Sequence, residues 1–178
     1  MTPLPAQRCF AASEFNLEPC VHKIPVSTDR RGEIPAGQSR LFEVPALNGH
    51  ANKLSGMYRR TYIRSAQNYP EAIPLTDEPN HALDCLDALT NDPDIHLSMP
   101  FEPGDIQFVY NHTVMHDRTR YQDWPEADRR RHLLRVWVSL PNDRELPPVY
   151  AQRYGQLTVG DRGGILTPSA TLCVPIEP

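Results

Sequence analysis

Three side chains of this sequence have the types and the spacing for a site that holds a metal and an anion: His116, Arg131 and Arg135. A neutral imidazole binds divalent metals, and a guanidinium binds a carboxylate through two parallel hydrogen bonds. The arginines follow the histidine by 15 and 19 positions (131 − 116 and 135 − 116), so they belong to a later element. Each residue also has an ordinary interpretation, with His116 as a structural histidine and Arg135 paired to a carboxylate on a neighbouring strand.

Alternating apolar residues predict the strands that position these side chains. In residues 106–111, Ile106, Phe108 and Tyr110 alternate with Gln107, Val109 and Asn111, which is typical of a half-buried strand. The chain is predicted to continue extended to His116 and to turn there. Residues 132–140 predict a second strand, whose faces carry Leu133, Arg135, Trp137 and Ser139 on one side and Leu134, Val136 and Val138 on the other. Because arginine keeps its charge, Arg135 among these apolar neighbours needs an anionic partner.

The rest of the chain predicts further strands and one helix. Strands are expected over 41–45, 54–62 and 95–99. A helix is predicted near 76–91, because Thr76 can cap its start and apolar residues recur at helical spacing at Ala82, Leu83, Leu86 and Leu89. Nineteen prolines favour strands and loops over long helices. The predicted fold class is therefore mainly β with one helix.

Composition excludes several classes of protein. A length of 178 residues indicates one domain. A net charge of −4 without a long basic run argues against nucleic-acid binding. No stretch has the length of a membrane-spanning helix, and no secretory signal is evident. The four cysteines have no metal-like spacing, which indicates reduced thiols, so we expect a cytoplasmic protein.

A family resemblance rests on residues 101–140, FEPGDIQFVYNHTVMHDRTRYQDWPEADRRRHLLRVWVSL. The order Gly-Asp, strand, His-x-Arg-Thr, acidic loop and Arg-x-x-x-Arg resembles the C-terminal part of the Fe(II)/2-oxoglutarate-dependent dioxygenases of the taurine dioxygenase (TauD/TfdA-like) family. The likeness is sharpest over 100–150 and weaker over 29–100 and 150–168. In that family, the residue matching His116 is an iron ligand. The residue matching Arg135 binds the 5-carboxylate of 2-oxoglutarate, and the one matching Arg131 assists.

The resemblance implies a fold, a function and a domain organisation. The fold is a partial double-stranded β-helix (jelly-roll, cupin-like). The function is an oxidoreductase, a dioxygenase that uses Fe(II) and 2-oxoglutarate to hydroxylate a small organic molecule. Residues 1–28 are then an unrelated or disordered leader, residues 29–168 the C-terminal part of the dioxygenase domain, and residues 169–178 a tail.

Two of the three ligands of the family's metal site are missing from the sequence. The facial triad takes two histidines and a carboxylate, and the family supplies the first two ligands as His-x-Asp or His-x-Glu. The residues two positions after the seven histidines are Ile24, Asn52, Leu83, Ser98, Val114, Arg118 and Leu134, and none is acidic. We therefore expect a truncated chain that binds Fe(II) weakly, or a short protein that an oligomeric or complementing partner completes. A catalytically inactive fragment, or a non-enzymatic scaffold or small-carboxylate-binding protein, is the alternative, and whether the chain is an enzyme stays open.

Overall fold

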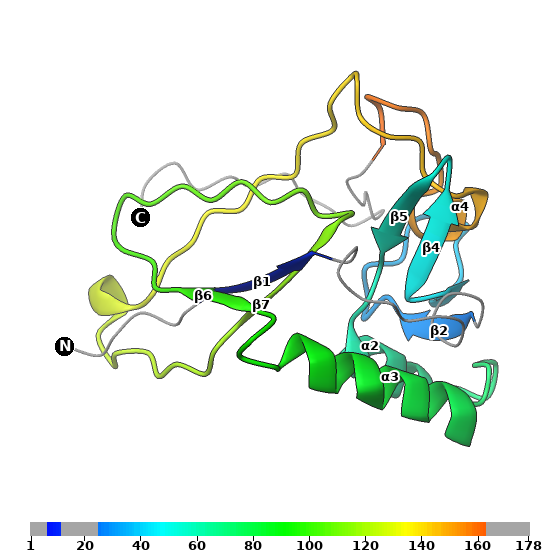
Figure 1. The fold of residues 1–178 in the computed structure, drawn as a ribbon, viewed down its shortest axis with the longest axis horizontal. Coiled ribbons are helices and arrows are strands. Elements are labelled where there is room, and N and C mark those ends of the chain that lie inside the picture. Colours follow the sequence, from blue (N-terminus) through cyan, green and yellow to red (C-terminus); the bar gives the residue numbers. More distant parts are fainter. Residues whose placement is uncertain (1–6, 12–24, 163–178) are drawn as a thin grey trace.

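The computed structural model of the chain describes residues 7–11 and 25–162, which Figure 1 shows as short strands and few helices. The strands are β1 (Gln7–Ala11), β2 (Val26–Asp29), β3 (Leu41–Val44), β4 (Leu47–His50), β5 (Lys53–Gly56), β6 (Leu97–Met99) and β7 (Val114–Arg118). The helices are α2 (Arg60–Ala66), α3 (Asp77–Thr90) and α4 (Ala151–Tyr154), with 3-10 turns at Ala127–Arg129 and Pro148–Tyr150. The arrangement is compatible with the predicted mainly β class. The described residues form three α-helices, whereas the sequence predicted one.

All strand pairs in the described part of the chain are antiparallel. One sheet has the order β6-β1-β7, and two separate pairs are β2-β3 and β4-β5. In the three-stranded sheet, Cys9 of β1 stands opposite His116 of β7. Residues 7–11 and 25–162 do not close into a jelly roll, so the described fold supports only the coarser mainly β assignment.

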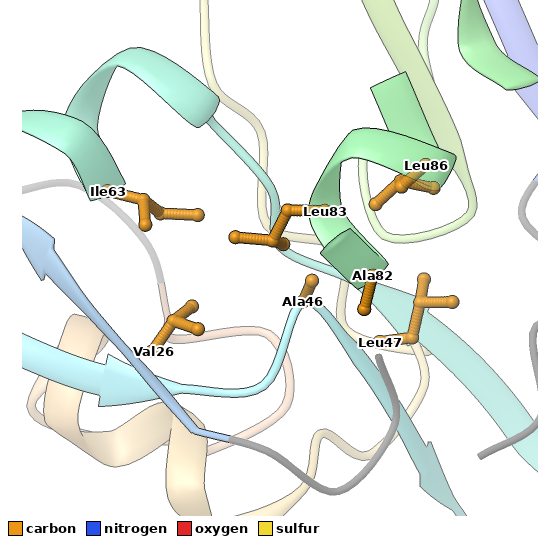
Figure 2. Close-up of a cluster of buried hydrophobic side chains, with 7 residues drawn as sticks. All are labelled: Val26, Ala46, Leu47, Ile63, Ala82, Leu83 and Leu86. Atoms are coloured by element: carbon orange, nitrogen blue, oxygen red, sulfur yellow. The ribbon is translucent and has the colours of Figure 1, made fainter. Parts of the chain in front are cut away.

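The core lies where the two helices α2 and α3 cover β2 and the start of β4. Figure 2 shows the buried side chains that meet there: Val26, Ala46, Leu47, Ile63, Ala82, Leu83 and Leu86. A second cluster joins Phe42 and Val44 of β3 to Leu146 and Tyr150 near α4. Burying a leucine side chain contributes about 1.5–3 kcal/mol relative to leaving it exposed. These two clusters therefore provide most of the apolar stabilisation of the described residues.

Helix α3 forms where the sequence predicted a helix. Thr76 occupies the N-cap position with an extended backbone, and Asp77 and Glu78 lie in the first turn. Acidic side chains stabilise a helix N-terminus through its dipole. The predicted apolar stripe is buried at Ala82, Leu83 and Leu86 and half-buried at Leu89.

The strand predicted over 54–62 was wrong beyond Gly56. The chain forms β5 up to Gly56 and then helix α2 from Arg60. Ile63 and Ala66, three positions apart, share one face of this helix and are both buried in the core. The aromatic and β-branched residues of this segment favour a strand. Packing of the buried face against the core outweighs that preference, and the segment forms a helix.

The strands predicted at 106–110 and 132–140 were also wrong. Both segments run without regular secondary structure, and neither joins a sheet of the described residues; they lie in the long green and yellow loops of Figure 1. Their apolar faces are open to solvent, with Phe108 94% and Val136 80% exposed. A strand needs a neighbour to receive its backbone hydrogen bonds and its apolar face, and the described residues supply neither.

Two further expectations concern the membrane and the cysteines. Among the described residues, no helix combines the length and the apolar character needed to cross a bilayer. Cys85 on α3 is an exposed free thiol. Cys20, Cys173 and the side chain of Cys9 lie outside what the structure describes, so their predicted thiol state stays a prediction, as do the domain boundaries at 28/29 and 168/169.

Candidate functional site

His116 lies in the middle of β7, and not at the end of a strand as the sequence suggested. His116 is exposed as a whole, but part of its imidazole ring is buried. This partial burial lowers the pKa of His116, and the positive charges of Arg135 and Arg59 lower it further, against smaller opposing effects of Asp117 and the Val114 backbone. The lowered pKa favours the neutral imidazole, which is the form that binds a metal.

Arg135 lies close enough to His116 for their charges to interact. The residue is exposed, and its guanidinium lies 5.9 Å from the centre of the Trp137 ring. The expectation that apolar strand neighbours bury it was wrong, because Leu134 and Val136 point to solvent as well. No ion pair links Arg135 to a carboxylate within residues 25–162. The guanidinium is thus available to an anion beside His116.

Arg131 is held by the acidic loop that precedes it. Its backbone N–H donates to Asp123 Oδ1 at 3.2 Å. Its guanidinium lies 5.3 Å from the centre of the Tyr121 ring, which Arg118 also covers at 4.6 Å. The half-buried Arg131 is therefore positioned by Tyr121 and Asp123, and no interaction of the described structure joins it to His116.

Arg59 is a functional candidate that the sequence did not reveal. It precedes α2, and its charge acts on both His116 and Arg153. Its guanidinium lies 4.4 Å from the centre of the Tyr62 ring. From the sequence, Arg59 was one of several basic residues on a predicted strand, 57 positions before His116 (116 − 59). No local signal could have indicated that these two residues come together.

The described residues do not fit a complete iron site. Within residues 25–162, no three His, Cys, Asp or Glu side chains gather into a group that could hold a metal. An open iron site of the facial-triad type needs three protein ligands. His116 could supply one of them, and a single imidazole holds Fe(II) only weakly.

Comparisons with known proteins assign the chain to a family. The model of the taurine catabolism dioxygenase TauD, TfdA family matches residues 21–137, a range that includes His116, Arg131 and Arg135. FR-33289 synthase of Streptomyces rubellomurinus (strain ATCC 31215) is 32% identical over 124 residues, which cover 67% of this chain and 36% of that protein. The chain thus spans about a third of the length of this curated relative. It belongs to the taurine catabolism dioxygenase (TauD/TfdA) family.

Proposed function

We propose that this chain is part of an Fe(II)/2-oxoglutarate-dependent dioxygenase that acts on a small organic molecule. Membership of the TauD/TfdA family supports this chemistry. The observation that carries the proposal is the closeness of His116 to Arg135, whose guanidinium has no ion pair among residues 25–162. A metal ligand and a carboxylate-binding group are the two functions that 2-oxoglutarate requires of its site.

In this proposal His116 is one iron ligand. Its lowered pKa favours the imidazole without a proton, which is the form that a metal can bind. The two other protein ligands would come from outside the described residues. Because the ligands present do not complete the site, we assign no step of the reaction to the metal.

Arg135 would be the main residue that binds the 5-carboxylate of 2-oxoglutarate, with Arg131 in a secondary role. Arginine presents a planar pair of N–H donors that matches a carboxylate, and lysine does not. Arg135 is exposed and close to His116, whereas Arg131 is stacked on Tyr121. Arg131 would therefore act through the loop that it stabilises or through the charge that it adds.

The apolar faces of 106–110 and 132–140 would pack against further β structure in the complete enzyme. Their alternating residues suit the half-buried strands of a double-stranded β-helix, and Ile106 and Leu134 are 80% and 73% exposed in the described chain. A partial double-stranded β-helix over 29–168 is the fold that this proposal expects.

Binding of 2-oxoglutarate tests the proposal. Calorimetry under anaerobic conditions should show that Arg135→Ala weakens 2-oxoglutarate binding about 10- to 100-fold, since a charge-assisted hydrogen-bonded pair is worth about 1.5–3 kcal/mol. Arg135→Lys should lose nearly as much. Arg129→Ala is the matched control, because this exposed arginine pairs with Glu126 and lies over Trp124. Equal affinity in the Arg135→Ala and Arg129→Ala variants would reject the role of Arg135.

A non-enzymatic protein that binds a small carboxylate is the second candidate. It is favoured by the presence of Arg131 and Arg135 in a sequence without His-x-Asp or His-x-Glu. The two candidates differ in their dependence on Fe(II). The chain alone should bind Fe(II) no more tightly than one histidine allows, and His116→Ala should remove that binding. If 2-oxoglutarate binds equally well with and without Fe(II), and with and without His116, the carboxylate-binding module is the better description.

A further inference from the structure

A cluster of arginines surrounds Tyr62 on one side of α2. The Arg59 guanidinium lies 4.4 Å and the Arg31 guanidinium 5.3 Å from the centre of the Tyr62 ring. Arg153 of α4 interacts electrostatically with both Arg59 and Tyr62. The three arginines come from the turn after β2, the start of α2 and α4, and α2 packs against β2 (Figure 1). Three separate parts of the chain thus bring positive charge to one aromatic ring.

The carboxylates nearby do not neutralise this cluster. Within residues 25–162, the ion pair that these arginines make joins Arg153 to Glu33 at 3.7 Å, and the Glu33 side chain is 63% exposed. Asp29 is buried and keeps its negative charge, but its two oxygens accept hydrogen bonds from the Arg31 amide and the Ser65 hydroxyl and make no ion pair with a guanidinium of the cluster. Within residues 25–162, Arg31 and Arg59 therefore make no ion pair, and Arg153 makes the one to Glu33.

A fourth arginine adds positive charge behind the cluster. Arg30 is buried, and its guanidinium donates to the carbonyl oxygens of Ser39, Arg153 and Gln152 and to the side chain of Gln38. These acceptors are neutral, and no ion pair within residues 25–162 involves Arg30. Burial and the charge of Arg153 lower the pKa of Arg30, and burial and the charge of Arg59 lower the pKa of Arg153. Like charges held together in this way favour the binding of an anion.

Arg153 has hydrogen-bonding capacity to spare. Its Nη1 is buried and finds no acceptor among the described residues, while Nη2 makes the long contact to Glu33. A buried donor without an acceptor is costly, by about 1–3 kcal/mol. An oxygen ligand that enters beside Tyr62 would provide the missing acceptor after a small movement of the side chain.

We propose that Arg31, Arg59 and Arg153, gathered around Tyr62, form a binding site for the oxyanion group of a small organic acid. Guanidinium groups bind carboxylate or phosphoryl-type oxygens through paired, charge-assisted hydrogen bonds. Cation–π contact with Tyr62 holds Arg31 and Arg59 in place before the ligand arrives, so less side-chain freedom is lost on binding.

The position of this oxyanion site suggests what the acid is. Arg59 belongs to the cluster, and its charge acts on both Arg153 and His116. An acid held by Arg59 would extend toward the candidate iron ligand. That this acid is the substrate rests on the proposed function, whereas the oxyanion site itself does not.

Titration of the full chain with inorganic phosphate, and separately with acetate, tests the oxyanion site. NMR of the arginine Nε–H groups at constant ionic strength should show saturable shifts at Arg31, Arg59 and Arg153. Arg59→Gln should weaken binding about tenfold, the loss of one charge-assisted interaction, and Arg59→Lys should weaken it less. Arg59 is exposed and makes no side-chain cap to α2, so its replacement leaves the helix intact, which circular dichroism can verify.

Arg64→Gln is the matched control, because Arg64 is exposed on the same helix and its loss removes the same charge. Equal weakening by Arg64→Gln and Arg59→Gln, or the absence of saturable shifts with both anions, overturns the oxyanion site. Phosphate binding that survives Arg135→Ala supports it as separate from the 2-oxoglutarate site. Binding of 2-oxoglutarate to the Arg135→Ala variant is measured in a separate experiment. The oxyanion site and the proposed function can therefore each fail without the other.

Discussion

The packed region, residues 25–90 and 141–162, and the open region, residues 97–140, carry the same kind of apolar pattern with opposite outcomes. In β3 of the packed region, Leu41, Phe42 and Val44 are buried. In the open region, Leu134 and Val136 are 73% and 80% exposed, and no residue of this region is buried. In the packed region, Leu146 and Tyr150 near α4 cover Phe42 and Val44, and helices α2 and α3 cover β2 and the start of β4. Alternation thus identifies the face that needs burial, but a second element must be present to bury it.

A polar clasp of Tyr110, Asp143, Arg144 and Arg162 connects the two regions. Asp143 accepts hydrogen bonds from the Tyr110 hydroxyl at 2.5 Å and from Arg162 Nη2 at 2.6 Å. Arg144 donates to Tyr110 Oη at 3.0 Å and to the Leu54 carbonyl at 2.7 Å. Tyr110 belongs to the open region and the other three residues to the packed region. The open region is therefore tied to the core by directional polar contacts.

The largest expected effect is on the free energy of unfolding, and it distinguishes a buried leucine of the packed region from an exposed leucine of the open region. Leu86→Ala should lower the free energy of unfolding by about 2–5 kcal/mol, because Leu86 is fully buried and its removal leaves a cavity. Leu134→Ala, the same change in the open region, should alter it by less than about 0.5 kcal/mol. Urea unfolding followed by circular dichroism measures both. Similar losses in the two variants would mean that the open region is covered in solution.

The next effect tests the polar clasp at neutral pH. Asp143→Asn should lower the free energy of unfolding by about 1–3 kcal/mol, because the buried Arg162 guanidinium loses its charged acceptor. Asp161→Asn is the control, since it makes the same charge change at an exposed neighbour. If both variants unfold at the same urea concentration as the unmodified chain, the clasp does not stabilise the packed region.

The same carboxylate predicts how stability depends on acid. Burial acts to raise the pKa of Asp143, but hydrogen bonds from Tyr110, the Arg144 amide and Arg162 outweigh burial and hold the pKa below its ordinary value. A lowered folded-state pKa contributes stability above the unfolded pKa of about 4 and loses it as pH falls through the folded value. Asp143→Asn should therefore flatten the decline in stability below about pH 4.

Local signals were sufficient for α3 and insufficient for α2. Thr76, the acids of the first turn and the stripe through Leu86 lie within one stretch of sequence, and the predicted helix was confirmed. Ile63 and Ala66 become a buried helical face only because β2 and α3 lie against them. The strand prediction for 54–62 failed because a tertiary contact decided the conformation.

The candidate site shows the same limit. The spacing of His116, Arg131 and Arg135 could be found in the sequence, and the structure brings Arg135 close to His116. The sequence could not show whether the predicted strands that carry Arg135 and precede His116 would form. Period-two alternation does not indicate whether a neighbouring strand is present to pair with them. Arg59 could be assigned only to a predicted strand with several basic residues, since its closeness to His116 depends on how β7 and α2 are arranged. The metal and carboxylate roles of the three residues stay predictions.

Substitutions in the open region should have a smaller effect on stability and a measurable effect on association between molecules. Replacing Phe108 and Val136 by serine should change the free energy of unfolding by less than about 0.5 kcal/mol, because both are exposed. Exposed apolar segments of extended chain promote association, so the double variant should sediment more as a monomer. Ala88→Ser on α3 is the control for an exposed residue of the packed region. Unchanged sedimentation would mean that these faces are not the contact between molecules.

The smallest effect is electrostatic and concerns His112, whose carbonyl accepts a hydrogen bond from the Gly56 amide. Burial lowers the pKa of His112, Arg162 and Arg144 lower it further, and Asp143 acts to raise it. Asp143→Asn should therefore lower this pKa again, and Arg162→Gln should raise it, as NMR titration of the imidazole can measure. With a lowered folded-state pKa, His112 contributes stability above its unfolded pKa and loses it as pH falls. Shifts of the same sign in both variants, or an equal shift in Asp161→Asn, would mean that His112 does not lie between the charges of the clasp. Opposite signs would establish that the packed region and the turn before β7 share one electrostatic environment.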